Sequence, residues 1–264
     1  MSSPDLLARI AAAKLAVLAQ TEFMLRDFGQ VKSEWKQDGS RVTAADIAIS
    51  EAIFHELGVQ FPEDEYLSEE LGDGTAAMAL SARFAWVLDP IDGTNNYATG
   101  IPYCAISLAL LEDGVPVYGV IYDMARRTLM HGGPGFGAWD GEKAVTVNTS
   151  TPTGQRLLGF HSPMDKSYSQ HAALIVSKFK IRGLGSSTLH LAYVGAGLLD
   201  GTVDHNVKVW DIAAAVPFCQ GAGGEIRYLK GPLFPLRVFD LNMPRVPFVA
   251  GSSALCDELA ELLA

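Results

Sequence analysis

A buried strand that breaks into a run of acidic turn residues constrains this chain more than any other feature. Residues 84–88 read Phe-Ala-Trp-Val-Leu, a continuously apolar run typical of a strand covered on both faces. The strand is expected to end abruptly at Asp89, where the turn Asp-Pro-Ile-Asp-Gly-Thr begins. In layered α/β proteins, ligands gather at the carboxyl ends of strands. We therefore expect an α/β chain with a carboxylate site at a sheet edge.

The chemistry of this turn suits a hard metal ion. Pro90 fixes one backbone angle, so Asp89 and Asp92 can converge on one point while the Ile91 carbonyl remains available to coordinate. Gly93 allows close approach of the backbone to a ligand. Oxygen ligands of this kind favour Mg²⁺ over zinc. The alternative is a turn in which aspartate only caps a helix, because Asp, Pro and Gly are common turn residues.

The first half of the chain is expected to hold helices followed by a mostly antiparallel sheet. Ser3 is placed to cap a helix over 4–28. Thr43 and Asp46 have the spacing of a capping box before a second helix, which Gly58 is expected to end. Apolar runs and turn residues then predict two hairpins. The predicted hairpin strands are 103–111 with 115–122, and 136–139 with 143–147.

The second half changes rhythm near residue 150. Alternation of short strands and helices there predicts an α/β layer with helices on both faces. We expect an N-terminal α+β domain over 1–150 and a C-terminal α/β domain over 151–264, with a tight interface between them. Pro217 should kink or shorten its helix. The predicted strands are 157–160, 202–204, 225–228 and 248–250, and the predicted helices are 168–179, 187–199, 211–222 and 254–263.

Charge restricts the partners of this chain. Its 264 residues carry 30 Asp and Glu against 20 Lys and Arg, a net charge of −10. Nucleic acid and anionic membranes require a basic face, so neither is an expected partner. A small anionic substrate would need cations from another source. Three widely spaced cysteines without a CxxC pair predict a reducing, cytoplasmic location, and no apolar run of about 18 residues predicts a membrane span.

The turn resembles the signature of the inositol monophosphatase family, Mg²⁺-dependent and lithium-sensitive phosphomonoesterases. Trp-Val-Leu precedes it and Asn-Asn-Tyr follows it. Three further segments agree in order: 36–46 is similar to Lys-x-Asp-x-Ser-x-Val-Thr-x-x-Asp, 68–70 to a Gly-Glu-Glu turn with Ser for Gly, and 210–215 to Trp-Asp-x-Ala-Ala-Gly with Ala for the last Gly. Alone, each acidic residue could be a cap or a solvated side chain. The resemblance implies a layered αβαβα sandwich of the inositol monophosphatase and fructose-1,6-bisphosphatase type.

The resemblance also implies a set of metal ligands. Glu69, Asp89 and the Ile91 carbonyl would hold a first Mg²⁺. Asp89, Asp92 and Asp211 would hold a second, with Asp89 shared between the two ions. Glu69 could also help to hold a weaker third ion. Two Mg²⁺ ions would clamp the attacking and leaving oxygens of an in-line displacement.

Catalytic roles follow from the same resemblance. Thr94 and Asp46 would take the proton from the metal-activated water, with Glu69 as the third catalytic residue. The backbone amides of Gly93 and Thr94 would receive phosphate oxygens. Lys36 is either an additional phosphate contact or a surface lysine.

The substrate side departs from the family pattern. Residues 182–187 resemble the Arg-x-x-Gly-Ser-Ala loop beside the alcohol, with Ser187 where Ala is usual. Asp204 stands where inositol-cleaving members carry a Glu that binds sugar hydroxyls, and the shorter side chain should change the preference among polyols. His205 beside it is unusual. The other histidines are expected to be structural or on the surface: His55, His131, His161, His171 and His190. The expected substrate contacts are Asp92, Gly93, Thr94, Ser187, Asp204 and Asp211.

Hydrolysis of a small phosphate monoester is the function that the resemblance implies. Inositol monophosphate is the first expectation, followed by histidinol phosphate, and then by a sugar bisphosphate or a 3′-phosphoadenosine nucleotide. The family also suggests a homodimer. A regulatory protein that has lost turnover is the alternative, but all five key residues are present: Glu69, Asp89, Asp92, Thr94 and Asp211.

Overall fold

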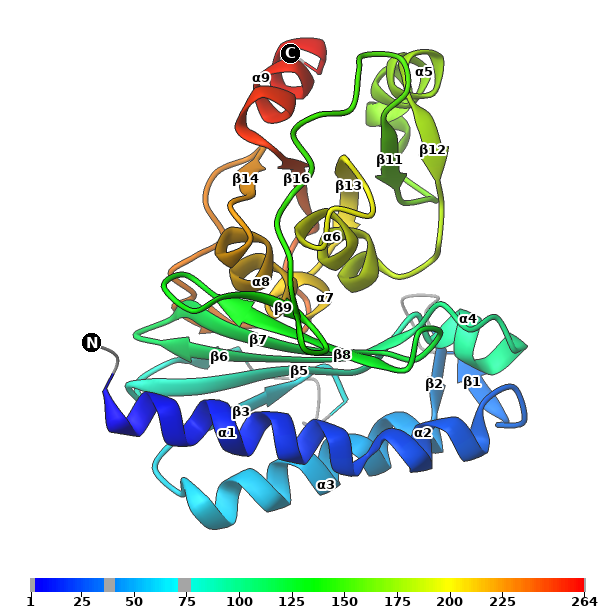
Figure 1. The fold of residues 1–264 in the computed structure, drawn as a ribbon. Helices are drawn as coiled ribbons and strands as arrows, with labels where there is room; N and C mark the ends of the chain where they lie inside the picture. The colour runs from blue at the N-terminus through cyan, green and yellow to red at the C-terminus, as the bar shows by residue number, and fades with distance from the viewer. Residues whose placement is uncertain (1–2, 36–40, 71–76, 264) are drawn as a thin grey trace.

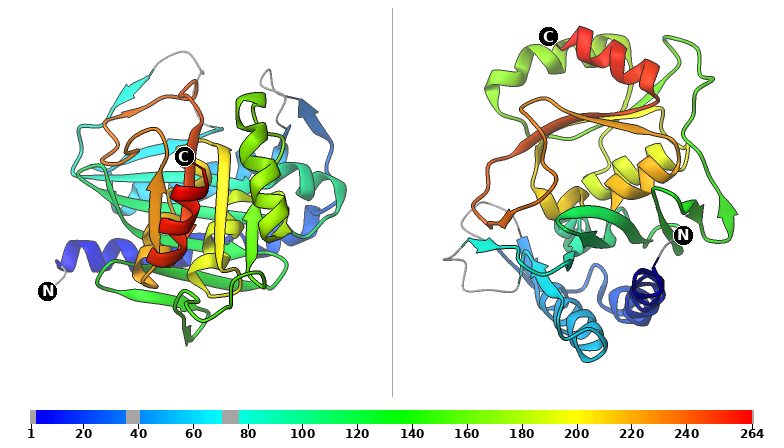
Figure 2. Two further views of the ribbon diagram at one scale, coloured as in Figure 1. Left: turned by 90° about the horizontal axis from the view of Figure 1, so that it is seen from above. Right: turned by 90° about the vertical axis from the view of Figure 1, so that its left-hand side faces the viewer.

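The chain folds into five alternating layers of helix and sheet (Figure 1). The computed structural model describes residues 3–35, 41–70 and 77–263. Outer helices, a seven-stranded sheet, inner helices, a five-stranded sheet and a second layer of outer helices follow one another, as the side view in Figure 2 also shows. Hydrophobic clusters fill the spaces between the layers. The predicted layered αβαβα sandwich is therefore confirmed.

The seven-stranded sheet comes from the first half of the chain. Its strand order is β10-β9-β8-β7-β6-β5-β3, and only the pair β3 and β5 is parallel. The predicted hairpin between β6 and β7 turns at Asp113 and Gly114, both at positive φ, which suits a tight hairpin turn. The strands are β3 (Glu65–Ser68), β5 (Phe84–Asp92), β6 (Ala105–Glu112), β7 (Val115–Asp123), β8 (Thr128–Gly133), β9 (Gly137–Asp140) and β10 (Lys143–Ala144).

Helices α1 (Pro4–Ala19), α2 (Thr21–Asp27) and α3 (Ala44–Gln60) form the outer layer on this sheet (Figure 1). One predicted continuous helix and one predicted helix end were wrong. The helix expected over 4–28 is interrupted at Gln20, whose N–H bonds back to the carbonyls of residues 17 and 18. The helix expected to end at Gly58 continues for two residues, because fully buried Leu57 anchors the last turn and glycine costs a helix only about 1 kcal/mol.

The second sheet has the order β12-β11-β13-β16-β14 and comes from the second half. Helices α6 (Ser187–Gly195) and α8 (Ala215–Gly221) cover its inner face, and α5 (Ser169–Lys178) and α9 (Ser253–Leu262) its outer face (Figure 1). This confirms the predicted α/β layer. The strands are β11 (Leu157–Phe160), β12 (Lys180–Arg182), β13 (Gly201–Val207), β14 (Glu225–Tyr228) and β16 (Val246–Gly251). The remaining elements are β1 (Ser33–Trp35), β2 (Arg41–Thr43), β4 (Met78–Ala79), α4 (Thr94–Thr99), the 3₁₀ turn η1 (Lys166–Tyr168), α7 (Val209–Ile212) and β15 (Val238–Phe239).

The helix predicted over 211–222 is divided into α7 and α8. Pro217 explains the break, since a continuous helix would need its missing N–H to bond the carbonyl of Ala213. The break brings the carbonyl oxygen of Ala214 against Gly119 of β7. A Cβ built on Gly119 would lie 1.8 Å from that oxygen. The inner helices and the seven-stranded sheet thus meet backbone to backbone at this point.

One hydrophobic cluster draws on both halves of the chain. It includes Val87 of the first sheet together with Leu189 and Phe218 of the inner helices. The division into domains over 1–150 and 151–264 stays a prediction. Within the described ranges, every helix is too short or too polar to cross a membrane.

Candidate active site

Strand β5 turns two aspartates toward the same side by means of a β-bulge. Asp89 pairs with Ser107 of β6 and Asp92 with Ala105, so three steps along β5 oppose two along β6. Side chains alternate along a regular strand, and residues three apart would point to opposite faces. The bulged residue cancels that difference, and Pro90, which cannot donate to the ladder, lies inside the bulge. The strand therefore continues to Asp92, and the prediction that it ends at Asp89 was wrong.

Asp211 adds a third carboxylate from the second half of the chain. One carboxylate oxygen each of Asp89, Asp92 and Asp211 lies within 4.8 Å of the others. At the start of α7 the Oδ2 of Asp211 accepts the N–H of Lys208 at 2.7 Å. This bond helps to hold the Asp211 carboxylate beside the two aspartates of β5.

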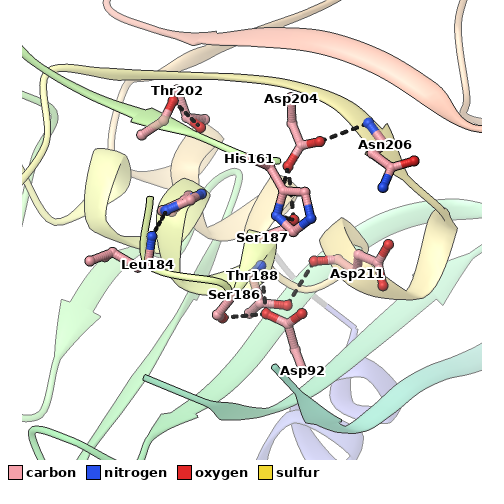
Figure 3. A network of polar contacts seen from close by, with 12 residues as sticks. Asp92, His161, Leu184, Ser186, Ser187, Thr188, Thr202, Asp204, Asn206 and Asp211 are labelled. Carbon is pink, nitrogen blue, oxygen red and sulfur yellow. Dashed lines mark hydrogen bonds and ion pairs between the residues drawn. The ribbon is translucent and has the colours of Figure 1, made fainter. Parts of the chain in front are cut away.

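The segment that begins α6 holds Asp92 in place (Figure 3). The Oδ2 of Asp92 accepts hydrogen bonds from the Ser186 hydroxyl and, at 2.8 Å, from the N–H of Thr188. Thr188 also donates its hydroxyl to the Asp211 carbonyl at 2.7 Å. A single short segment thus fixes both Asp92 and the backbone of Asp211 across the boundary between the two sheets.

Glu69 reaches the same sheet edge through parallel pairing. Ser68 at the end of β3 lies opposite Leu88 of β5. Glu69 and Asp89 are the next residues of these two strands, and the carboxyl ends of parallel neighbours lie at one edge. Glu69 lines the same cavity as the aspartates, although it is not one of the three residues whose oxygens lie within 4.8 Å. The structure thus brings all four predicted acidic ligands to one place.

Burial and mutual repulsion favour the protonated form of this cluster. Burial raises the pKa of Asp89 well above its usual range, and the charges of Glu69 and Asp92 raise it further. The pKa of Asp211 is likewise raised well above its usual range by burial, and then by the charge of Asp92. Burial raises the pKa of Asp92 despite the hydrogen bonds that it accepts. A divalent cation would offset the cost of ionising these carboxylates, because it neutralises negative charge that burial disfavours.

The structure also brings Thr94 and Asp46 together. Asp46 is fully buried at the start of α3, where its Oδ2 accepts the N–H and the hydroxyl of Thr43 at 2.8 and 2.6 Å. The predicted capping box is thereby confirmed. The Oδ1 of Asp46 lies 3.4 Å from the Thr94 hydroxyl, which is also 2.9 Å from the Ile91 carbonyl oxygen. Asp46 therefore caps its helix with one oxygen and faces Thr94 with the other.

Gly93 occupies a position that only glycine fits. Its φ is +90°, and an added Cβ would lie 2.9 Å from the Tyr103 carbonyl oxygen and 3.2 Å from that of Gly185. Just beyond, the side-chain amide of Asn96 donates to the carbonyls of Tyr103 and Leu184 at 2.8 and 2.7 Å. The turn after β5 is thus packed tightly against the loop that precedes α6.

Asp204 is not one of the cavity-lining residues, but it contacts Ser187, which is one (Figure 3). It is 1% exposed, and its two oxygens accept the Ser187 hydroxyl and the N–H of Asn206, each at 2.8 Å. Ser187 itself lines the cavity. The structure therefore gives Asp204 the task of holding Ser187 and Asn206, whereas direct contact between Asp204 and a substrate stays a prediction.

The cavity beside the carboxylates has a volume of about 440 Å³ and includes residues that sequence reasoning missed. His161 lines it, with Nδ1 3.4 Å from the Ser187 hydroxyl and 3.9 Å from Asp204 Oδ2. Its assignment as a structural or surface histidine stays a prediction. Arg41 and Arg245 also line the cavity and supply positive charge. His161 and Arg245 carry no local motif, because separate loops bring them to the site, and Arg41 begins β2 at an unspecified position of the 36–46 segment. Lys36, the stretch 36–40 and Leu71-Gly72 lie outside the described residues.

The fold and the site together define a class of layered αβαβα proteins with a carboxylate centre between two sheets. The chain belongs to the inositol monophosphatase family, whose sequence pattern matches residues 5–263. The resemblance predicted from the turn after β5 is therefore confirmed.

Individual relatives agree over most of the chain. It is 34% identical over 218 residues to the Nus factor SuhB of Xylella fastidiosa, covering 80% of this chain and 77% of that protein. It is 33% identical over 216 residues to an inositol-1-monophosphatase of Mesorhizobium japonicum, covering 78% and 80%. The crystal structure of the suppressor protein SuhB of Bartonella henselae superposes with a TM-score of 0.84 at 26% identity, over 97% of this chain and 98% of that one.

Proposed function

We propose that this chain is a Mg²⁺-dependent phosphomonoesterase that acts on a small polyol or alcohol phosphate, with inositol monophosphate as the first candidate. Its family of metal-dependent phosphatases supports the reaction class. The observation that carries the proposal is the convergence of Asp89, Asp92 and Asp211 beside the pair formed by Thr94 and Asp46.

The donor set fits Mg²⁺, because the three converging ligands are all carboxylates. Glu69, Asp89 and the Ile91 carbonyl would hold one ion, and Asp89, Asp92 and Asp211 a second, with Glu69 also available to a third. Protein N–H groups orient these side chains, as the N–H of Ile91 does for Asp89 Oδ1 at 3.1 Å. When bound, Mg²⁺ supplies the Lewis-acid charge that phosphoryl transfer requires.

Proton removal from the attacking water is assigned to Thr94 and Asp46. The Thr94 hydroxyl has one proton, which it can give either to the Ile91 carbonyl or to Asp46 Oδ1. When it donates to Asp46, its lone pairs can accept a hydrogen bond from the water. Asp46 is the ultimate acceptor in this scheme, because Thr43 holds its other oxygen and keeps the carboxylate in place. Glu69 is a second carboxylate on the same cavity.

The phosphate and the alcohol would occupy opposite parts of the cavity. The amides of Gly93 and Thr94 are assigned to the phosphate oxygens, while Asp92 and Asp211 flank the reacting group. Ser187, held by Asp204, is assigned to the alcohol. Histidinol phosphate, a sugar bisphosphate and a 3′-phosphoadenosine nucleotide are the alternative substrates in the same family.

A phosphate-release panel tests this proposal. Inositol, histidinol, fructose and nucleotide phosphates would each be incubated with the protein in Mg²⁺, with EDTA and with added lithium. We expect release from at least one compound, loss of release in EDTA and inhibition by lithium. If the folded wild-type chain released phosphate from none of them, the enzyme proposal would fail and the non-catalytic regulatory alternative would gain support.

We also propose that the chain has two domains. The domain over 1–150 carries most of the metal ligands, and the domain over 151–264 carries Asp211 and the specificity residues. We further propose that the protein is a homodimer with a cytoplasmic location. The three cysteines are free and buried, which agrees with a reducing compartment.

A further inference from the structure

A second cavity of about 530 Å³ adjoins the candidate active site. Pro163, Asn206 and Arg245 line both cavities, so the two share a wall. The rest of this second space, the side cavity, is bounded by the segment before α5, the end of β13 and Lys230 after β14. A substrate with its phosphate at the carboxylate centre could therefore extend into the side cavity past Asn206.

His205, which lines the side cavity, carries a polar atom that the protein does not use. This residue is 4% exposed, and its Nε2 lies 3.0 Å from Nδ1 of His171. Its Nδ1 is buried and meets no hydrogen-bond partner within the described part of the chain. His205 and Tyr168 both line the side cavity, where the Tyr168 hydroxyl interacts with Lys230. Because buried polar groups in folded proteins are nearly always paired, Nδ1 of His205 points to a ligand.

Charge indicates what kind of ligand this is. Two cations, Lys230 and Arg245, stand on the side cavity against one carboxylate, Asp165. That carboxylate is already hydrogen-bonded to the N–H of Ser167 at 2.8 Å. Although the chain as a whole is acidic, the net charge of the side-cavity lining is positive, opposite in sign to that of the adjoining carboxylate centre.

Ring packing holds these groups in place. The Tyr168 and His205 ring centroids are 4.3 Å apart, and the Lys230 ammonium lies 5.3 Å from the Tyr168 ring centroid. Burial lowers the pKa of His205 to about 4, so its ring is neutral near pH 7. When Nδ1 of His171 donates to Nε2 of His205, the single ring proton of His205 lies on Nδ1, which can then donate to an anion. Arg245 is anchored by its own bond to the Asn206 carbonyl at 3.1 Å. The side cavity thus combines fixed donors with two positive charges.

We propose that the side cavity is a second anion subsite, which binds a phosphate or carboxylate carried by the leaving alcohol through Lys230, Arg245 and Nδ1 of His205. This inference rests on the proposed phosphomonoesterase function and narrows its substrate class. The preferred substrate is a small phosphorylated alcohol with another anionic group remote from the phosphate that is cleaved. His205, the residue that departs from the family pattern, then becomes a specificity residue.

Two matched substrate pairs test the subsite. The first compares fructose 1,6-bisphosphate with fructose 1-phosphate, and the second compares 3-phosphoglycerate with glycerol 3-phosphate. In at least one pair, we expect the member with two separate anionic groups to have a KM about tenfold lower than the member with one. The reason is that hydrogen bonds to charged groups are strong. Which pair shows the preference distinguishes a remote phosphate from a remote carboxylate.

The variant Lys230→Met should remove that preference. It should leave kcat and KM unchanged for the member of each pair that has the cleaved phosphate as its only anionic group. Lys180→Met is the matched control, because Lys180 is exposed on β12 and lines neither cavity. His205→Gln should raise KM only for the member with two separate anionic groups. Equal KM values within both pairs in the wild type would overturn the subsite while leaving the proposed function standing. An increase in KM in Lys230→Met that is equal for both members of a pair would overturn it in the same way.

A binding measurement separates this inference from the proposed function. Calorimetric titration of fructose 1,6-bisphosphate and 3-phosphoglycerate into the protein in EDTA requires no turnover. Binding that Lys230→Met weakens about tenfold, but Lys180→Met does not, would support the subsite even if no compound were hydrolysed. Binding of both compounds that is indifferent to Lys230→Met would overturn it.

Discussion

The Thr94 hydroxyl lies 2.9 Å from the Ile91 carbonyl oxygen and 3.4 Å from Asp46 Oδ1, so one proton has two acceptors. Only the bond to Asp46 links the hydroxyl to a group that can accept a proton. Thr94→Ala should therefore lower kcat by about 10²–10⁴-fold, the usual contribution of general acid–base catalysis. Steady-state phosphate release at saturating Mg²⁺ measures this.

Thr94→Ser is the matched control, because it keeps the hydroxyl and should retain most of kcat. An alanine variant with kcat near the wild-type value would remove Thr94 from the mechanism. Equal losses in the two variants would instead indicate that the methyl group, and hence packing, is what matters.

Asp89→Asn separates metal binding from folding. Asparagine keeps an oxygen that can accept the N–H of Ile91, but it removes the charge that repels Glu69 and Asp92. We expect kcat to fall more than about 10²-fold, as when a charge-stabilising group is lost, and the rise in Tm that Mg²⁺ produces to shrink.

In EDTA the same variant should melt no lower than the wild type. Asp113→Asn, at an exposed position in the turn between β6 and β7 and away from both cavities, is the control for the substitution itself. A variant that kept most of its turnover would show that Asp89 is not a ligand, and one that melted well below the wild type in EDTA would contradict the repulsion argument.

Gly93→Ala should destabilise the protein beyond the cost of its backbone conformation. A left-handed φ costs a residue with a Cβ about 1–2 kcal/mol. At Gly93 the Cβ would also meet carbonyl oxygens at 2.9 and 3.2 Å. Gly135→Ala is the matched control, since Gly135 has a φ of +82° and nothing within 4 Å of the added Cβ.

Denaturant unfolding of the two variants gives the contact contribution as the difference between their free energies of unfolding. We expect Gly93→Ala to be the less stable, and activity to fall only in that variant. Equal losses of stability would mean that the turn yields easily at Gly93.

The stabilising effect of Mg²⁺ should grow as the pH rises. The raised pKa values of Asp89 and Asp211 mean that the metal-free native state holds protons that the unfolded chain, with aspartate pKa near 3.9, has lost. Their contribution to stability is complete below that unfolded pKa and is lost as the pH rises through the folded pKa. Bound Mg²⁺ replaces the protons and removes this loss.

Melting temperatures in EDTA and in Mg²⁺ between pH 5 and pH 8 test this expectation. Histidines such as His131, whose pKa burial lowers to about 4, change both series alike, so the difference between the series reports the carboxylates. A difference that stayed constant over this range would argue against a protonated cluster.

The acidic half of the site could be predicted because its signals are local. Asp89 and Asp92 follow an apolar strand within four residues, and Thr43 with Asp46 satisfies a capping box. The bulge that makes Asp89 and Asp92 converge was not predicted, since it depends on pairing with β6. Local pattern thus located these ligands, and sheet pairing explains their geometry.

The substrate side could not be predicted in the same way. His161, Arg245 and Lys230 reach the cavities from separate loops, and none has a spacing that marks it. Asp204 contacts the Ser187 hydroxyl, which comes from α6 and becomes its neighbour only after folding. The helix break near Pro217 was predicted, but its partner Gly119 lies about a hundred residues away in the sequence.

That contact between Gly119 and the Ala214 carbonyl has a consequence for how this chain can change. Because the two main chains are in direct contact, substitutions of neighbouring side chains cannot change the distance between Gly119 and the Ala214 carbonyl. Asp211 lies three residues before Ala214, so this backbone contact sets how far Asp211 extends into the site. A side chain at position 119, remote from every reacting atom, would therefore displace the segment that carries Asp211.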